Sequence, residues 1–382
     1  MGRVVLLVLS LLALLVPVGS RATDDPPELL ILVSYHPGEA WSDRELAGVQ
    51  QTLRQTYPEL LPAIEYLDAK RFREPEHLGR LKDYLAQKYQ GRSPDLIIAL
   101  DNSALDLLLD DSAELFAGVP VVFGGINDYR PELLTKRPDM TGVAQTHDLA
   151  DGLELLLRLH PEARRLWVIH DHTNTGRAMG QEITRLIPGL QGRVQIEFAP
   201  DVPFDELRRQ LAALTDDSLV LLLAYTVDGT GKSLELTDIT RFINATKAVP
   251  VYATHELLLG QGIVGGLLLD GYRHGAQVAA LARRVLDGET PERIPVEPSQ
   301  PQPAFDARQL QRFGIQLADL PPDSLVINQP LSFYTLHRVW VWSALVGLIL
   351  LALVILALAS ALVRIHQAKR LSAANAERLR LA

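Results

Sequence analysis

The 382-residue sequence contains no cysteine, and this absence excludes disulfide bonds, thiolate metal sites and thiol catalysis. Positive charge is scarce as well. The chain has 37 lysine and arginine residues and 46 aspartate and glutamate residues, which gives a formal charge of −9. A nucleic-acid partner is therefore not expected, because phosphate binding requires a basic surface. Apolar residues form 47% of the chain, which is enough to build a sizeable core.

An uncharged segment near the N-terminus predicts export. This segment, 4–15, follows Arg3 and is too short to cross a bilayer. Residues 20–22 after it have the small-x-small pattern of a cleavage site. We therefore expect residues 1–22 to be a signal peptide, with an uncleaved anchor as the alternative.

A second uncharged segment, 339–363, exceeds the ~20 residues that a bilayer requires and predicts a transmembrane helix. Trp340 and Trp342 stand at its beginning, where indole rings favour the membrane interface. Five basic residues and one acidic residue follow it, in 364–382. By the positive-inside rule this tail is cytoplasmic. The expected location is the inner membrane, with residues 23–338 in the periplasm.

Between these segments, short apolar runs alternate with amphipathic helical patterns. The first set predicts strands at 29–33, 63–67, 95–100 and 119–123, and helices at 42–56, 75–89 and from 102. The second set predicts helices at 151–159, 176–186, 204–214 and 233–245, and strands at 166–170, 194–198, 219–224 and 249–253. This alternation is typical of an α/β fold with doubly wound parallel sheets.

Two similar sets of elements indicate two lobes. We expect the first lobe to contain residues 23–130 together with about 256–300, and the second to contain 131–255. A proline-rich stretch then ends the α/β region, and 301–338 is expected to be a connector to the membrane.

Polar and aromatic residues follow the predicted strands. Ligands of open parallel sheets bind at the carboxyl ends of the strands, where helix N-termini present free backbone N–H groups. Ordinary caps and turns use the same residue types, so each single residue is ambiguous and the set as a whole favours a ligand site. The candidate ligand-binding residues are Ser34, Tyr35, His36, Trp41, Asp101, Asn102, Ser103, Gly125, Asn127, Asp171, Thr173, Tyr225, Thr254 and Glu256.

Two other patterns are weaker. The segment 228–233 lies between a strand and a helix like a phosphate-binding loop, but Thr226 occupies the position of the first glycine. His170 and His172 share one face of a strand, yet spacing identifies no third metal ligand. No nucleophile-elbow or zinc-protease motif is present. We therefore expect no catalytic residues, no metal and no cofactor.

Several motifs carry a resemblance to a known family. They are Ser34-Tyr35-His36-Pro37-Gly38 with Trp41, Asp101-Asn102, Phe123-Gly124-Gly125-Ile126-Asn127, Gln309-Leu310 with Phe313-Gly314-Ile315, Leu320-Pro321, Ser324–Pro330 and Phe333-Tyr334. With them, residues 28–363 resemble the ABC-transporter substrate-binding-protein-like domain that forms the extracellular input of bacterial sensor histidine kinases and diguanylate cyclases. The resemblance implies a type I periplasmic-binding fold with a hinged cleft, and a small, amino-acid-like ligand.

The sequence departs from these sensors at its end. It stops at Ala382, where they continue into a cytoplasmic output domain, so kinase or cyclase activity has no support in the residues present. We expect a fragment of such a sensor, or a protein that signals through a separate partner, possible partners being a second copy or a permease.

Three hypotheses follow. The first is a sensory receptor that closes around a ligand and signals through its membrane helix, as in two-component systems. The second is the substrate-binding component of an ABC transporter. The membrane span counts against it, as does the lack of a cysteine for lipid attachment. The third is an exported enzyme whose site is unrecognised.

Overall fold

The computed structural model describes residues 27–380 except 73, 111–114, 136, 246–248 and 331–332. The expected signal peptide, 1–22, lies outside these residues. The chain divides into two compact units, one ending at Asn328 and the other beginning at Gln329.

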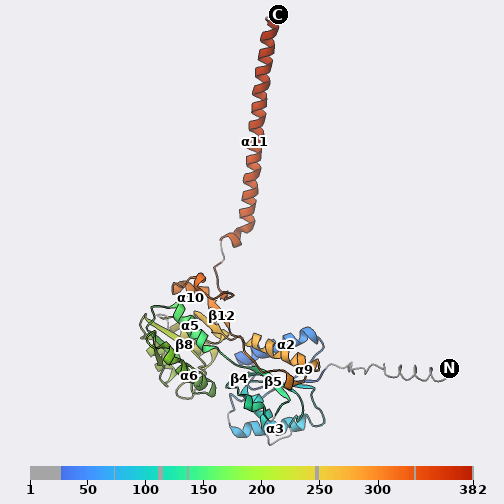
Figure 1. Ribbon diagram of the computed structural model, residues 1–382, viewed down its shortest axis with the longest axis vertical. Coiled ribbons are helices and arrows are strands. Elements are labelled where there is room, and N and C mark those ends of the chain that lie inside the picture. Colours follow the sequence, from blue (N-terminus) through green and yellow to red (C-terminus); the bar gives the residue numbers. More distant parts are fainter. Residues whose placement is uncertain are drawn as a thin grey trace, which may run out of the picture. The chain divides into compact units, whose positions relative to one another are not determined.

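The first unit contains two sheets (Figure 1). In the described residues, all strand pairs of the first sheet are parallel. Its strand order is β11-β5-β4-β3-β1-β2. The strands are β1 (Leu29–Val33), β2 (Ala63–Tyr66), β3 (Leu96–Leu100), β4 (Val121–Ile126), β5 (Met140–Ala144) and β11 (Glu297–Pro298).

Helices cover both faces of this sheet, as an unbroken aliphatic strand requires. Leu29, Ile31 and Val33 of β1 pack against one pair of helices, and Leu30 and Leu32 pack on the opposite face. The helices are α2 (Ala40–Thr56) and α9 (Gly271–Leu286) on one face, and α3 (Pro75–Lys88) and α4 (Asn102–Leu109) on the other (Figure 1). We call this sheet and its helices the first lobe.

The second sheet has the strand order β13-β12-β10-β9-β8-β6-β7. Its strands are β6 (Arg165–Ile169), β7 (Gln195–Phe198), β8 (Ser218–Leu222), β9 (Val251–Ala253), β10 (Gly265–Leu268), β12 (Gln302–Asp306) and β13 (Leu325–Ile327). Its strand pairs are parallel, except that β12 runs antiparallel to β10.

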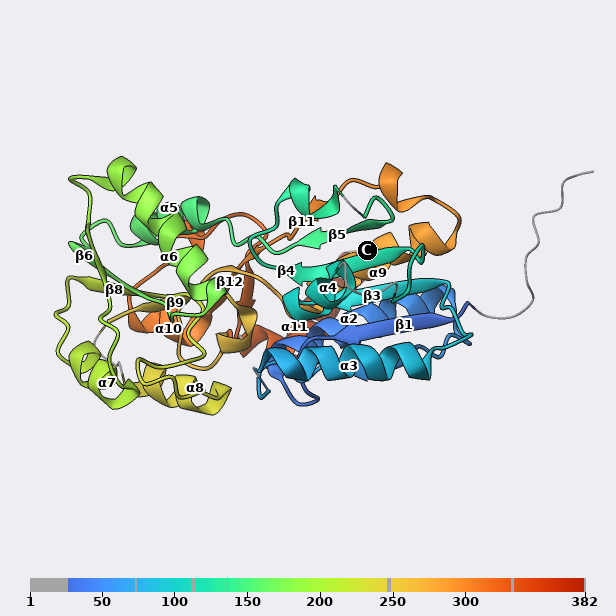
Figure 2. The ribbon, with the colours of Figure 1, turned by 90° about the horizontal axis from the view of Figure 1, so that it is seen from below.

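Helices also cover both faces of the second sheet, and together they form the second lobe. On one face lie α5 (Leu149–Leu159), α6 (Asn174–Leu186) and α10 (Ala307–Arg312), and on the other α7 (Phe204–Ala212) and α8 (Leu236–Ala245) (Figure 2). Short 3-10 helices lie at Pro131–Leu134, Ile187–Leu190, Glu256–Leu258, Pro291–Arg293 and Leu317–Asp319.

Three segments connect the lobes within the part of the chain that the structure describes. Residues 145–148 join β5 to α5, residues 269–270 join β10 to α9, and residues 299–301 join β11 to β12. Side chains on or beside these connections are therefore placed where the two lobes meet.

The expected lobe boundaries assign two strands to the wrong sheet. β5, which follows residue 131, pairs with β4 in the first sheet, and β10, which follows residue 256, pairs with β9 in the second. The expected connector 301–338 also contributes β12 and β13 to the second sheet.

The packing of α2 against α9 depends on glycine. A Cβ atom at Gly48 would collide with the carbonyl oxygen of Tyr272, and one at Gly275 would collide with that of Glu45. The backbones of the two helices therefore approach each other more closely than side chains allow.

The second unit consists mainly of α11 (Phe333–Arg380). Its segment Leu336–Ser372 is long and apolar enough to cross a membrane. Its backbone departs from helical geometry at His337. The Trp342 indole N–H donates to the Tyr334 hydroxyl at 3.1 Å, beside the expected membrane interface.

Candidate functional site

A group of aromatic and amide side chains surrounds the connection 145–148. We call Trp41, Gln145, His147, His255 and His274 the junction cluster. Trp41 lies in the first turn of α2 in the first lobe, and His255 follows β9 in the second. The Trp41 ring centroid lies 5.5 Å from that of His255, in edge contact, and 5.9 Å from that of His274. The cluster thus joins both lobes to the connection between them.

His147 and His255 face each other at the centre of this cluster. Their Nε2 atoms are 3.4 Å apart, and the Gln145 amide nitrogen lies 3.3 and 3.5 Å from them. Burial lowers the pKa of both imidazoles, that of His255 to about 4, so both are neutral at neutral pH.

His274 is fixed by two hydrogen-bond partners. Its Nε2 accepts from the Gly125 backbone N–H at 2.7 Å, and its Nδ1 lies 3.2 Å from the Ser299 hydroxyl on another connection. Burial lowers the pKa of His274 to about 4. Nε2 therefore holds a lone pair, and Nδ1 carries the proton.

The carboxyl of Glu45 lies behind His274, with its Oε1 atom 3.3 Å from His274 Nε2 and both side chains fully buried. Burial, with the charges of Asp101 and Glu39, raises its pKa well above the ordinary value. Because the facing nitrogen presents a lone pair, the protonated form of Glu45 is favoured. A Cβ at Gly124 would lie 2.8 Å from Glu45 Oε1, so glycine makes room for this carboxyl.

Asp101 lies at the end of β3 with a φ of 67°, in the region that favours glycine. Its Oδ2 accepts from the Ser42 hydroxyl at 3.2 Å. Burial, together with the charge of Glu39, raises its pKa to about 7. A Cβ at Gly125 would lie 2.7 Å from Asp101 Oδ1, so the close approach of this carboxyl requires glycine at position 125.

Two junction atoms are buried without a hydrogen-bond partner among the residues that the structure describes: Trp41 Nε1 and Gln145 Oε1. The Trp41 indole N–H is directed toward the Asp101 carboxyl and lowers its pKa as a weak hydrogen-bond donor, although the pair does not meet strict hydrogen-bond geometry. Buried polar groups are normally paired, and an unpaired one costs ~1–3 kcal/mol. These atoms are therefore well suited to contact a bound molecule.

Other predicted residues are paired with each other within the first lobe. The Ser34 hydroxyl donates to Leu100 O at 2.7 Å and accepts from the Ala104 N–H at 2.8 Å. The side chain of Asn102 donates to Asn127 O at 3.2 Å and accepts from the Asn127 N–H at 3.1 Å. These contacts fix strand ends to the helices that follow them.

Tyr35 and His36 lie beside this region. Burial raises the pKa of Tyr35, with Asp101 as the next cause, and Lys70 lies 5.0 Å above the Tyr35 ring. Lys70 also binds Glu39 at 2.9 Å, and His36 lies 3.6 Å from Asp68. Ser103 is half-buried in the first turn of α4.

The predicted residues of the second lobe belong to separate contacts. Asp171 accepts from the backbone N–H groups of Thr173 at 3.0 Å and Thr226 at 2.6 Å, and from their hydroxyls. Tyr225 is buried and stacks on Phe242 with a centroid distance of 6.3 Å.

The residues after β9 do reach the junction. Thr254 lies 3.1 Å from His255 Nδ1 through its hydroxyl. Glu256 forms an ion pair with Arg44 of α2 at 3.2 Å, so it links the lobes.

Sequence reasoning missed Gln145, His147, His255 and His274 as site residues, although it named Thr254 and Glu256 on either side of His255. The signal for the first two was present, because they directly follow β5 and the strand-end rule applies there. That strand was not predicted, so the residues after it were not considered. His274 and Glu45 lie within helices, where no strand-end pattern points to them.

The two weaker patterns have other roles. Asp228 Oδ1 accepts from the Thr230 and Lys232 N–H groups at 2.9 and 3.0 Å, so the groups that a phosphate-binding loop would offer are already used. His172 pairs with Asp201 at 3.0 Å on the surface, and His170 contacts its neighbour's carbonyl. Within the described residues, no group of three or more His, Cys, Asp or Glu side chains is arranged to hold a metal.

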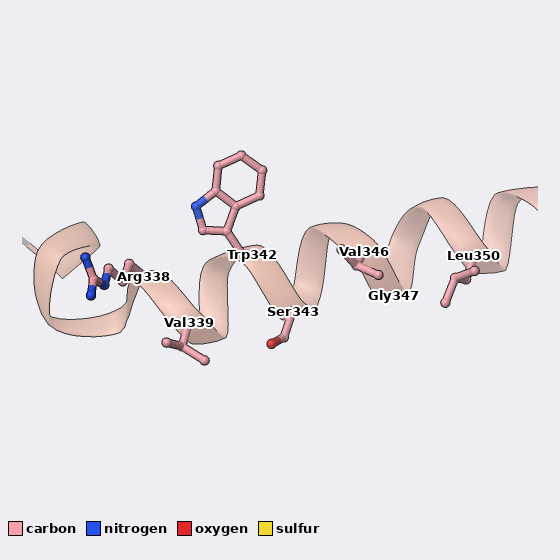
Figure 3. Close-up of a pocket in the computed structure, with 7 residues that line it drawn as sticks. All are labelled: Arg338, Val339, Trp342, Ser343, Val346, Gly347 and Leu350. Carbon is pink, nitrogen blue, oxygen red and sulfur yellow. The ribbon is translucent and has the colours of Figure 1, made fainter.

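The described residues also line a groove on α11 and a hollow beside α9. A groove of about 630 Å³ runs along α11 (Figure 3) and is lined by Arg338, Val339, Trp342, Ser343, Val346, Gly347 and Leu350. A hollow of about 190 Å³ lies beside α9, where His274, Asp270 and Gln300 line it. This hollow borders two of the connections and reaches the junction cluster through His274.

No family model matches the chain, and no curated protein matches it. Solved structures do. The ABC domain in complex with L-Trp from Streptococcus pneumonia is 16% identical, with a TM-score of 0.57 over 79% of this chain and 100% of that one. A ligand-free, open substrate-binding protein with adhesive properties from Clostridium difficile is 14% identical, with a TM-score of 0.58 over 80% and 100%. This chain has a type I periplasmic-binding-protein fold.

A conserved domain protein from Vibrio cholerae is similar at the same level, with 15% identity, a TM-score of 0.56, and coverage of 79% of this chain and 100% of that one. At these identities the likeness establishes the two-lobed fold that sequence analysis predicted. The residues that contact a ligand in this chain must be inferred from its own contacts.

Proposed function

We propose that this chain is a membrane-anchored receptor that binds a small molecule at the junction cluster and passes the resulting lobe closure to α11. The observation that carries the proposal is a pair of buried polar atoms, Trp41 Nε1 and Gln145 Oε1, which lie beside the connections between the lobes and have no hydrogen-bond partner in the described part of the chain.

Similar folds support a small ligand. One of the similar proteins holds L-Trp, and another is a substrate-binding protein in an open, ligand-free state. We propose an amino-acid-like ligand whose apolar part packs against the Trp41 and His255 rings. The ring nitrogens of these two residues would bind the polar head group of the ligand. A ligand shifts the lobes toward closure only by its difference in affinity between the two states.

We further propose that the two lobes are periplasmic and that the basic residues after 363 lie in the cytoplasm. The long apolar α11 favours a receptor over a binding protein released for transport, since a signal must cross the membrane. Binding without catalysis by the two lobes is part of this proposal.

A thermal-shift screen of the full chain in detergent, against amino acids, nucleobases and small carboxylates, tests the proposal. A ligand at a hundred times its dissociation constant adds ~2.7 kcal/mol to the free energy of unfolding. Trp41→Phe keeps an aromatic ring but removes the indole N–H, so it should weaken binding about tenfold.

The matched control is Trp167→Phe, because the Trp167 indole N–H binds Glu197 at 3.1 Å in the second lobe. This control should bind the ligand like the unaltered chain. A ligand whose affinity is the same in Trp41→Phe would remove the junction cluster as its site, and a broad screen without any shift would reject the receptor proposal.

A further inference from the structure

Three polar atoms of the junction cluster form a nearly equilateral triangle. His147 Nε2 and His255 Nε2 are 3.4 Å apart, and the Gln145 side-chain amide lies 3.3 Å from the first and 3.5 Å from the second. The ring centroids of the two histidines are 5.0 Å apart, farther than their Nε2 atoms, so both nitrogens are directed inward. Gln145 and His147 come from a connection, and His255 from the second lobe.

The size of this triangle matches a metal coordination shape. Metal–nitrogen bonds of 2.0–2.1 Å in a tetrahedron place neighbouring ligand atoms about 3.3–3.4 Å apart. An ion about 2.1 Å from three atoms that are 3.4 Å apart would lie about 0.7 Å out of their plane, which leaves a fourth position of a tetrahedron open.

The His255 imidazole is oriented for this role by a neighbouring hydroxyl. His255 Nδ1 lies 3.1 Å from the Thr254 hydroxyl, which can accept its N–H and leave the Nε2 lone pair directed into the triangle.

The amide supplies the third corner. In the structure its NH₂ group faces the two imidazoles, and Oε1 is buried without a hydrogen-bond partner among the described residues. A half-turn of the amide exchanges these atoms and directs the oxygen into the triangle. Amide oxygen is an ordinary metal ligand, and the half-turn removes the unpaired acceptor from its present position.

We propose that His147, His255 and Gln145 bind a divalent transition-metal ion of the Zn²⁺ type, with the fourth position open to water or to a carboxylate of an incoming ligand. Two imidazole nitrogens disfavour Mg²⁺ and Ca²⁺, which prefer oxygen. The ion would tie the connection 145–148 to the second lobe. The inference goes beyond the proposed function, although it uses the same cluster.

Zn²⁺ titration of the full chain in detergent tests this site. The protein is purified without a histidine tag and stripped with chelator, and Zn²⁺ is partitioned against a chromophoric chelator. We expect one Zn²⁺ per chain. His147→Ala and His255→Ala should each weaken binding at least tenfold. Gln145→Glu replaces a neutral ligand atom by a charged one of the same reach and should strengthen binding about tenfold.

The matched control is the double variant His170→Ala/His172→Ala, which removes a second pair of histidines whose ring centroids are 6.2 Å apart. It should bind Zn²⁺ like the unaltered chain. Melting curves in chelator show which variants fold. Weaker binding by a folded Gln145→Glu variant, or equal binding by a folded His147→Ala/His255→Ala variant, would overturn the metal site.

The two proposals fail separately. Organic ligands found in the presence of chelator, in a chain that binds no Zn²⁺, would reject the metal site and keep the receptor. Zn²⁺ binding that depends on His147 and His255, without any organic ligand in the screen, would keep the metal site and reject the receptor for free small molecules.

Discussion

Asn102 and Asn127 follow β3 and β4 in the first lobe. The Asn102 side chain donates to the Asn127 carbonyl and accepts from its N–H, and the Asn127 side chain donates to the Gly125 carbonyl. Trp41 and Gln145 lie where the lobes meet, and each keeps a buried polar atom without a hydrogen-bond partner among the described residues. Both pairs follow strands or begin helices. Position at a strand end therefore does not distinguish a ligand contact from a turn, whereas hydrogen-bond accounting does.

The largest expected effect is on a fully paired residue of the second lobe. Asp171→Ala removes the acceptor of two backbone N–H groups and two hydroxyls, so it should lower the free energy of unfolding by about 3 kcal/mol. Urea unfolding measures this loss. Ligand affinity at low temperature should be unchanged. A loss of affinity without a loss of stability would show that a fully paired residue contacts the ligand.

The buried Asp101 predicts a dependence on pH. Its pKa is about 7 in the fold and near 4 when unfolded, so the folded chain holds an extra proton between these values. The buried Asp101 carboxyl therefore lowers the unfolding free energy as pH rises through this window, and the full loss applies above pH 7. Asp101→Asn should raise the unfolding free energy by about 2 kcal/mol at pH 8 and leave it unchanged near pH 3.

Denaturant unfolding at both pH values checks this prediction. The control is Asp43→Asn, which removes an acceptor of the exposed Gly38 N–H. An Asp101→Asn variant that is less stable than the unaltered chain at pH 8 would show that the fold stabilises the Asp101 carboxylate and does not raise its pKa.

His255 predicts the opposite slope. Its pKa is lowered to about 4, so the unfolded chain holds the extra proton between about pH 4 and 6.5. Its contribution to stability is present above pH 6.5 and is lost as pH falls toward 4. His255→Asn should make the fall in unfolding free energy across this window smaller by about 1 kcal/mol. An unchanged slope in a pH series of melting curves would contradict the neutral imidazole.

The smallest effect is expected for the exposed histidine. His172 and its partner Asp201 are each about half exposed, at 54% and 50%. His172→Ala should change the unfolding free energy by less than about 0.5 kcal/mol, because water screens exposed ion pairs. Thermal unfolding at pH 7 measures it. A loss comparable to that of Asp171→Ala would show that exposure is a poor guide in this protein.

The sequence predicted the alternation of buried strands and amphipathic helices well. Its first strand, 29–33, coincides with β1, because five aliphatic residues buried on both faces leave an unbroken pattern. Its last predicted helix of the second lobe, 233–245, begins too early. Ser233 pairs with Val227 in a bridge and Leu234 donates to Thr226, so α8 begins at Leu236.

The strand β5 shows why part of the site could not be predicted. Thr141 and Gly142 interrupt its apolar pattern, although all five of its residues are buried. A Cβ at Gly142 would collide with the Phe123 carbonyl, so this glycine is set by backbone packing across the sheet. Thr141 is satisfied by a hydrogen bond to Ile294 O, 153 residues away. Local periodicity carries no record of such partners, and Gln145 and His147 were missed with the strand.

The glycine contacts between α2 and α9 have a consequence for recognition. Trp41 begins the first of these helices, and His274 lies in the second. Because the backbones touch at Gly48 and Gly275, we expect the two helices to resist sliding past each other and to move together. The first lobe's wall of the site is thus preorganised, so the ordering cost of binding falls on the connection 145–148 and on the second lobe.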